Sequence, residues 1–178
     1  MLFSCEDKDE AADAIHKHIE IGKKIISFKL DSSINANSSF DIKLEFPEIN
    51  EVDSSLFKTI LLQETEKVMN KSAISDSLLE NQDQVIAELE RSYKAFKTDF
   101  PEINSEWYLN RTVEVVYQSK KYISIMYHEQ SYFGGAHSNE IKTFKTFELK
   151  TGNQISLSQL LSNEEYLITE GLAESKLR

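Results

Sequence analysis

Alternation of apolar and polar residues predicts a β-hairpin near the start of the chain. The stretch from Phe40 to Phe46 alternates strictly between apolar and charged residues, which is typical of a strand with one buried face. Residues 24–30 are β-branched and apolar and predict a preceding strand, and the Ser- and Asn-rich residues 31–39 supply turn chemistry between the two. Because proline cannot donate a hydrogen bond to a ladder, we expect Pro47 to end the second strand.

Two stretches that follow show the spacing of amphipathic helices. Between residues 52 and 70 the apolar positions form one helical stripe, with Asn50 or Asp53 as the candidate N-cap. A second stripe runs from residue 83 to residue 97. The sequence therefore predicts two helices between the hairpin and the remaining half of the chain.

The remaining half is predominantly β in pattern. A long strand with one buried face is predicted by five residues of one parity, namely Trp107, Leu109, Val113, Val115 and Tyr117. Further strands are predicted at 122–128 and 141–149, and Ser158 is the candidate cap of a short helix. A last amphipathic pattern continues to Arg178 and predicts that the protein has further residues. The fold class is α+β, with antiparallel sheets packed against two to three helices.

Composition and charge narrow the class of protein. The chain has 178 residues, a hydrophobic fraction of 40% and only five glycines and two prolines, which together indicate a folded chain. We expect three parts, a tether at 1–22, an N-terminal α+β subdomain at 23–104 and a truncated β-rich subdomain at 105–178. The net charge of −10 argues against nucleic-acid binding. This acidic charge is consistent with attraction of a basic partner protein, or with a role in solubility alone.

The first ten residues resemble the end of a bacterial lipobox. Leu2-Phe3-Ser4-Cys5 precedes the acidic run 6–10, which is too charged to fold and is typical of a solvated tether. We expect lipidation at Cys5 and a location in the cell envelope, either periplasmic or on the surface. The alternative is a cytosolic protein with a chance cysteine. No apolar run reaches the ~20 residues that span a bilayer, so the membrane contact would be the lipid anchor alone.

The least ordinary segment is the loop at 132–139, which lies between two predicted strands. Adjacent glycines permit close approach of another chain, and large rings beside exposed amides suit the recognition of sugars or proteins. The predicted ligand-binding residues are Tyr132, Phe133, Gly134, Gly135, Ala136 and His137. In the alternative, structural interpretation, the glycines turn the chain, the rings cap the core and His137 bonds a backbone carbonyl.

Several motifs in a fixed order resemble a bacterial extracytoplasmic family of two adjoining domains of unknown function. These motifs are Trp107-Tyr108-Leu109, Tyr132-x-Gly-Gly-Ala-His137, Phe147-Glu148-Leu149-x-Thr151-Gly152 and Ile155-x-Leu157. The resemblance covers residues 24 to 175. The family occurs in the outer portion of lysozyme-sensing anti-sigma factors, in some peptidoglycan deacetylases and in many lipoproteins. It therefore implies a non-catalytic binding or sensing role, with a cationic protein such as lysozyme or a peptidoglycan fragment as the ligand.

Candidate catalytic and metal chemistry is weak in this sequence. His16 and His18 have no clustered acids or cysteines to complete a metal shell. His128 and His137 lack the spacing of a hydrolytic metal motif, and neither a nucleophile elbow nor a phosphate loop is present. We therefore expect no catalytic residues, no metal and no cofactor. Two alternatives stay open, a cell-wall carbohydrate enzyme that uses His137 with a carboxylate, and a purely structural envelope protein.

Overall fold

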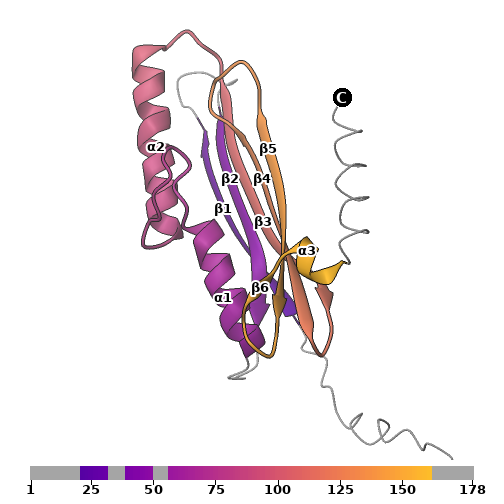
Figure 1. Cartoon of the computed structure of the whole chain (residues 1–178). Coiled ribbons are helices and arrows are strands. Elements are labelled where there is room, and N and C mark those ends of the chain that lie inside the picture. Colours follow the sequence, from indigo (N-terminus) through magenta and orange to yellow (C-terminus); the bar gives the residue numbers. More distant parts are fainter. Residues whose placement is uncertain (1–20, 32–38, 50–55, 162–178) are drawn as a thin grey trace, which may run out of the picture.

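In the part of the chain that the structure describes, six strands form one sheet, and two long helices pack on one of its faces (Figure 1). The computed structural model describes residues 21–31, 39–49 and 56–161. The elements in chain order are β1 (Ile21–Asp31), β2 (Ser39–Ile49), α1 (Leu56–Met69), α2 (Gln82–Asp99), β3 (Glu106–Gln118), β4 (Tyr122–Tyr132), β5 (Asn139–Glu148), β6 (Gln154–Ile155) and α3 (Leu157–Leu160).

The strands lie in the sheet in the order of the chain, from β1 to β6. All neighbours pair antiparallel except β2 and β3, which are parallel. A parallel pair needs a long crossover, and the segment that carries α1 and α2 provides it. The predicted α+β class and the predicted hairpin are confirmed. The two predicted subdomains share this sheet, because β2 lies in the first and β3 in the second.

The core lies between the two helices and the face that they cover, which we call the inner face. Helix α1 contacts β2, β3 and β4, and α2 contacts β2. Helix α2 buries Val85, Leu89 and Tyr93. The ring of Tyr93 stacks on Phe40 of β2 at 5.4 Å between centroids and meets Trp107 of β3 edge-on at 5.5 Å. These aromatic contacts join helix and sheet at the end where β4 turns into β5.

Both long helices match their predicted positions. Helix α2 begins directly after Asn81, whose side-chain oxygen accepts a hydrogen bond of 3.1 Å from the backbone N–H of Gln84. This side chain satisfies one of the N–H groups that a helix start leaves unpaired. The caps predicted for α1, Asn50 and Asp53, lie outside the described residues.

Four details of the structure differ from the expectation. Pro47 does not end β2, since the strand continues to Ile49; beyond Glu45 it pairs with β1 only, so the missing N–H costs little. Tyr117 is exposed, because a register shift between Val115 and Tyr117 breaks the parity of β3. The short helix α3 is capped by Ser156 rather than Ser158. Strand β1 begins two residues inside the predicted tether.

Part of the chain lies outside the described residues. This part includes the predicted lipidation site Cys5, the histidines His16 and His18, and the last predicted helix after residue 162. Among the helices that the structure does describe, none combines the length and the apolar character that a membrane span requires.

Candidate functional site

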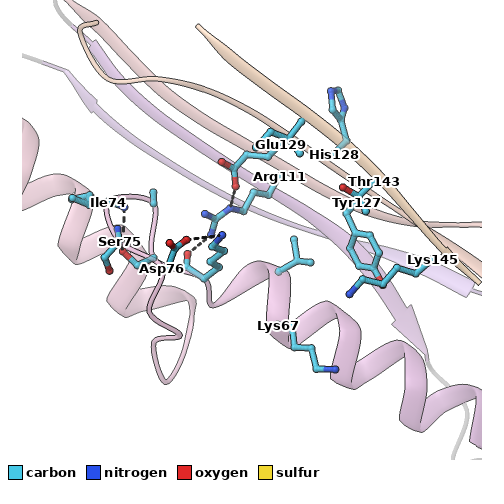
Figure 2. Close-up of a pocket in the computed structure, with 15 residues that line it drawn as sticks. Lys67, Ile74, Ser75, Asp76, Arg111, Tyr127, His128, Glu129, Thr143 and Lys145 are labelled. Carbon is cyan, nitrogen blue, oxygen red and sulfur yellow. Dashed lines mark hydrogen bonds and ion pairs between the residues drawn. The ribbon is translucent and has the colours of Figure 1, made fainter. Parts of the chain in front are cut away.

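A cleft of about 430 Å³ lies between the loop that follows α1 and the inner face of strands β3 to β5 (Figure 2). One wall is formed by residues 67–68 and 71–76. The other wall is formed by Arg111 of β3, residues 127–129 of β4 and residues 141–145 of β5, from which Ile141, Thr143 and Lys145 contribute. Hydroxyl, aliphatic and charged side chains therefore meet in one open hollow, which is the mixture found in sites for small polar ligands.

Arg111 is the most deeply buried charge in this cleft, with 1% of the residue exposed. It occupies an inward position of β3 between Leu109 and Val113. Its Nε donates to Oε2 of Glu129 at 2.7 Å, and its Nη1 donates to the backbone carbonyl of Lys71. Pairing of this kind offsets the cost of taking a charge out of water. Arg111 thus ties β3 and β4 to the loop after α1.

A buried carboxylate on α1 binds three residues that line the cleft. Glu64 is 4% exposed and accepts hydrogen bonds from Lys67 (2.5 Å), Lys145 (2.8 Å) and the hydroxyl of Tyr127 (2.9 Å). Burial alone would raise the pKa of the Glu64 carboxyl, but the three donors outweigh it and hold that pKa below its ordinary value. Burial, together with the bond to Glu64, raises the pKa of Tyr127 well above its ordinary value. This cluster locks α1 to β4 and β5.

The charge of the cleft is opposite to that of the chain. Its lining carries four cationic side chains, Lys67, Lys71, Arg111 and Lys145, and two carboxylates, Asp76 and Glu129. The chain as a whole has a net charge of −10. The ring of His128 belongs to the outer face, where it pairs with Glu140 at 2.8 Å. A locally positive hollow in an acidic protein favours an anionic group over a cationic one.

The predicted loop lies at the opposite end of the inner face from Glu64. Tyr132 is the last residue of β4, and its ring faces Tyr108 at 6.2 Å on the outer face. Phe133 contacts Trp107 at 5.6 Å and packs against the core. Gly134 has a φ of 79°, and a Cβ placed on it would lie 3.0 Å from Nε1 of Trp107. Phe133 therefore packs on the core, and the backbone of Gly134 passes close to Trp107.

The tip of the loop has a different character. Gly135, Ala136 and His137 are exposed, and no hydrogen bond joins the ring of His137 to another described residue. A Cβ on Gly135 would meet only the carbonyl of His137, at 4.0 Å. Neither the cleft nor a second, smaller cavity beside β1 is lined by residues 132–139. The structure thus does not bring Tyr132, Phe133 and His137 together in a groove, and ligand binding at this loop stays a prediction.

Two charged residues on buried faces are the signals in the sequence that point to the cleft. Arg111 has the same parity as the buried residues Leu109 and Val113, so a charge was placed at an inward position of a strand. Glu64 follows Ile60 by four residues and therefore lies on the apolar stripe of α1. A charged residue on a buried face needs a partner, and this need points to a polar site.

Comparison with known proteins places the chain in a family. Residues 6–140 match the family described as Deacetylase PdaC. Two solved structures share the fold. A DUF3298 family protein from Pseudomonas aeruginosa PAO1 has a TM-score of 0.55 and 14% identity over 88% of this chain and 66% of its own. A member of the same family from Bacteroides fragilis NCTC 9343 has a TM-score of 0.51 and 16% identity over 78% and 60%.

These comparisons support the family resemblance at a coarse level. At such low identity the two solved structures show the fold alone, and this chain spans less than two thirds of either protein. No curated protein matches the chain. Among the described residues, no group of three or more histidines, cysteines and acids is close enough to hold a metal ion.

Proposed function

Because this chain belongs to the family described as Deacetylase PdaC, we propose that it is a non-catalytic module of a cell-envelope protein that binds peptidoglycan fragments. The observation that carries this proposal is the cleft of about 430 Å³ between the loop after α1 and strands β3 to β5. Peptidoglycan fragments carry hydroxyl, amide, methyl and carboxylate groups. The hydroxyls of Ser75 and Thr143, the aliphatic side chain of Ile141 and the cations of the cleft match these groups in kind.

A binding role fits the state of the acidic side chains at the cleft. A general base must accept a proton from a substrate, and an unengaged carboxylate with a raised pKa serves best. Glu129 is paired with Arg111, and Glu64 holds three donors and has a lowered pKa. Both carboxylates are therefore occupied in holding the fold. The remaining acid of the lining, Asp76, pairs with Lys71 at 3.3 Å, so the acids of the cleft favour binding over hydrolysis.

The envelope location of this module rests on the N-terminal sequence. We propose that Cys5 is the lipidated residue and that the acidic residues after it hold the domain away from a membrane surface. Mass spectrometry of the protein from its native host tests this directly. A diacylglyceryl-modified cysteine is the expected result, and an unmodified thiol in a cytosolic fraction would reject both the anchor and the location.

The binding proposal is tested by titration of the full chain with muramyl dipeptide. Chemical shifts of backbone amides report where a ligand contacts the protein, and we expect changes at residues 71–76, 111 and 127–129. Shift changes confined to the loop at 132–139 would move the site there. No change anywhere at millimolar concentration would reject peptidoglycan fragments as ligands.

Catalysis is tested in the same samples. The mixture is assayed for released acetate after long incubation with N-acetylated glycan, with and without added divalent metal. We expect no release above buffer. Release that depends on the protein, and that is lost in a His137→Ala variant, would instead support the carbohydrate-enzyme alternative.

A cationic protein such as lysozyme is a second candidate ligand, favoured by the net charge of −10 and the exposed loop tip at 135–137. Opposite net charges would speed the encounter, most strongly at low salt. Calorimetry with lysozyme at low and at physiological salt tests this candidate. Binding that persists at physiological salt and weakens in a His137→Ala variant supports it, and absence of heat at low salt rejects it.

A further inference from the structure

The geometry of the cleft points to a carboxylate-binding site, with Arg111 and Lys71 as the residues that hold the acid. This inference rests on the proposed function and deepens it, because it names the chemical group of the ligand that the cleft recognises. It depends on three features of the described residues, which are the coordination of Arg111, the placement of Lys71 and the charge of the cleft lining.

The guanidinium of Arg111 has spare donor capacity. Its Nε is bonded to Glu129 and its Nη1 to the carbonyl of Lys71, while the third nitrogen, Nη2, has no partner among the described residues. A guanidinium presents five N–H donors in a fixed planar fork, and its usual partner is a carboxylate or a phosphate. Glu129 and the Lys71 carbonyl hold this fork in one orientation before any ligand arrives, and such preorganisation lowers the entropic cost of binding.

Lys71 supplies a second cation beside the first. Its backbone carbonyl is the acceptor of Arg111, so the two residues are neighbours in the cleft, and its ammonium pairs with Asp76 at 3.3 Å. The side chains of Lys71 and Asp76 are both exposed. An ion pair between exposed side chains is weak. The carboxylate of Asp76 therefore occupies the position beside Lys71 that the acid of a ligand would take, and it competes with that acid.

The remaining groups of the cleft set the class of ligand. The lining carries four cations and two carboxylates, and the excess of cations is still one when Glu64, which pairs with Lys67 and Lys145, is counted. Ile74 and Ile141 add aliphatic surface. A ligand that joins one carboxylate to a partly apolar, hydroxyl- or amide-bearing body fits both features. The stem-peptide and lactyl acids of peptidoglycan belong to this class. Neutral glycan does not carry the acid.

The experiment compares matched probes on the full chain by nuclear magnetic resonance titration. The probes are muramyl dipeptide, its methyl ester, the neutral disaccharide N,N′-diacetylchitobiose and sodium acetate. We expect the free acid to bind roughly tenfold tighter than the ester, because one charge-assisted contact corresponds to about that factor. Acetate is expected to shift the same signals around Arg111 and Lys71 at higher concentration, and N,N′-diacetylchitobiose is expected to leave them unchanged.

Variants of the exposed residues Lys71 and Asp76 test the site without disturbing the fold. Lys71→Ala is expected to weaken binding of the free acid by about threefold to tenfold, and Asp76→Asn to strengthen it by about twofold to fivefold. The matched controls are Lys150→Ala and Asp99→Asn, which change the net charge equally but lie outside the cleft. Both controls are expected to leave the affinity unchanged. Binding of the acid is also expected to weaken as salt is raised from roughly 20 to about 200 mM, because salt screens the attraction between opposite charges.

The outcomes separate this inference from the proposed function. Equal affinity for acid and ester, unaffected by Lys71→Ala, overturns the carboxylate site and leaves fragment binding standing. Acetate binding at the cleft without muramyl dipeptide binding supports the carboxylate site and removes the peptidoglycan ligand. A loss of affinity in Lys150→Ala equal to that in Lys71→Ala also overturns the inference, because the effect would then come from net charge alone.

Discussion

The substitution Glu64→Gln tests whether the buried carboxylate of α1 holds the helix to strands β4 and β5. Glutamine has nearly the same size, so the change removes the charge without opening a cavity. In the structure Glu64 is 4% exposed and accepts from Lys67, Lys145 and Tyr127. The neutral amide keeps one acceptor oxygen and turns an NH₂ group toward at least one of these donors.

The three contacts do not contribute equally. Lys67 has 59% of its side chain exposed, so its ion pair is worth at most about 1 kcal/mol. Lys145 is 31% exposed and the hydroxyl of Tyr127 is buried, and loss of a charged partner costs about 1 kcal/mol for each. The variant no longer has to bury a charged carboxylate, and this gain offsets part of the lost stability. We expect Glu64→Gln to lower the free energy of unfolding by about 2 kcal/mol at pH 7, or roughly 4–8 °C in Tm.

The pH dependence gives the sharper test. The folded-state pKa of Glu64 is lowered, so its contribution is present above the ordinary value of 4.5 and is lost as pH falls through the folded-state pKa. The difference between wild type and Glu64→Gln should therefore shrink as pH falls below 4.5. Urea unfolding from pH 3 to pH 7, followed by the fluorescence of the single tryptophan, Trp107, measures it. Glu66→Gln, on the exposed side of the same helix, is the matched control. Equal losses in both variants, or a Glu64 loss that persists undiminished to pH 3, would refute this reasoning.

Three further substitutions test other contacts. Gly134→Ala should cost about 1–3 kcal/mol in urea unfolding, because its φ of 79° strains an L-residue and its Cβ would press on the core, whereas Gly135→Ala should cost little. Tyr127→Phe should lower the free energy of unfolding by about 1 kcal/mol at pH 8. Because the pKa of Tyr127 is raised in the folded state, its contribution is present below the ordinary value of 10 and is lost as pH rises toward the folded-state pKa, so the difference in stability between wild type and variant should shrink above pH 10. Asn81→Ala should lower the unfolding free energy by about 1 kcal/mol through loss of the α2 cap, and an unchanged Tm would contradict that role.

The elements that the sequence predicted well are those with local determinants. The alternation of Phe40 to Phe46 and the helical stripes of 52–70 and 83–97 depend on neighbours within a few residues. The structure places strands and helices at these positions, with ends that differ by a few residues. Strand ends are set by the partner strand instead. Pro47 could therefore stay within β2, because β3 no longer pairs with the strand at that point.

The cleft was beyond prediction for a related reason. Its walls come from residues 67–76, 111, 127–129 and 141–145, which only the order of strands in the sheet brings together. The parallel pairing of β2 with β3 puts β4 and β5 on the side of β3 away from the hairpin, where the loop after α1 covers them in part. Periodicity indicates that a residue faces inward but not which residue it meets there. The signal of the exposed glycine loop, by contrast, lies in consecutive residues, so the sequence alone reveals it.

The inner face changes character along its width, and this change bears on function. Near α2 it is apolar, with Phe40 and Leu109 fully buried, whereas under the loop after α1 it carries Arg111 and Glu129. Folding alone gives no reason for that change, because apolar residues of similar volume often replace a buried ion pair at no cost, or with a gain of about 1–4 kcal/mol. Binding does give a reason. An arginine held by two protein acceptors, with Nη2 still without a partner among the described residues, is already oriented for an acid. The residue that makes the inner face less suited to simple packing is thus the residue that makes the cleft suited to a ligand.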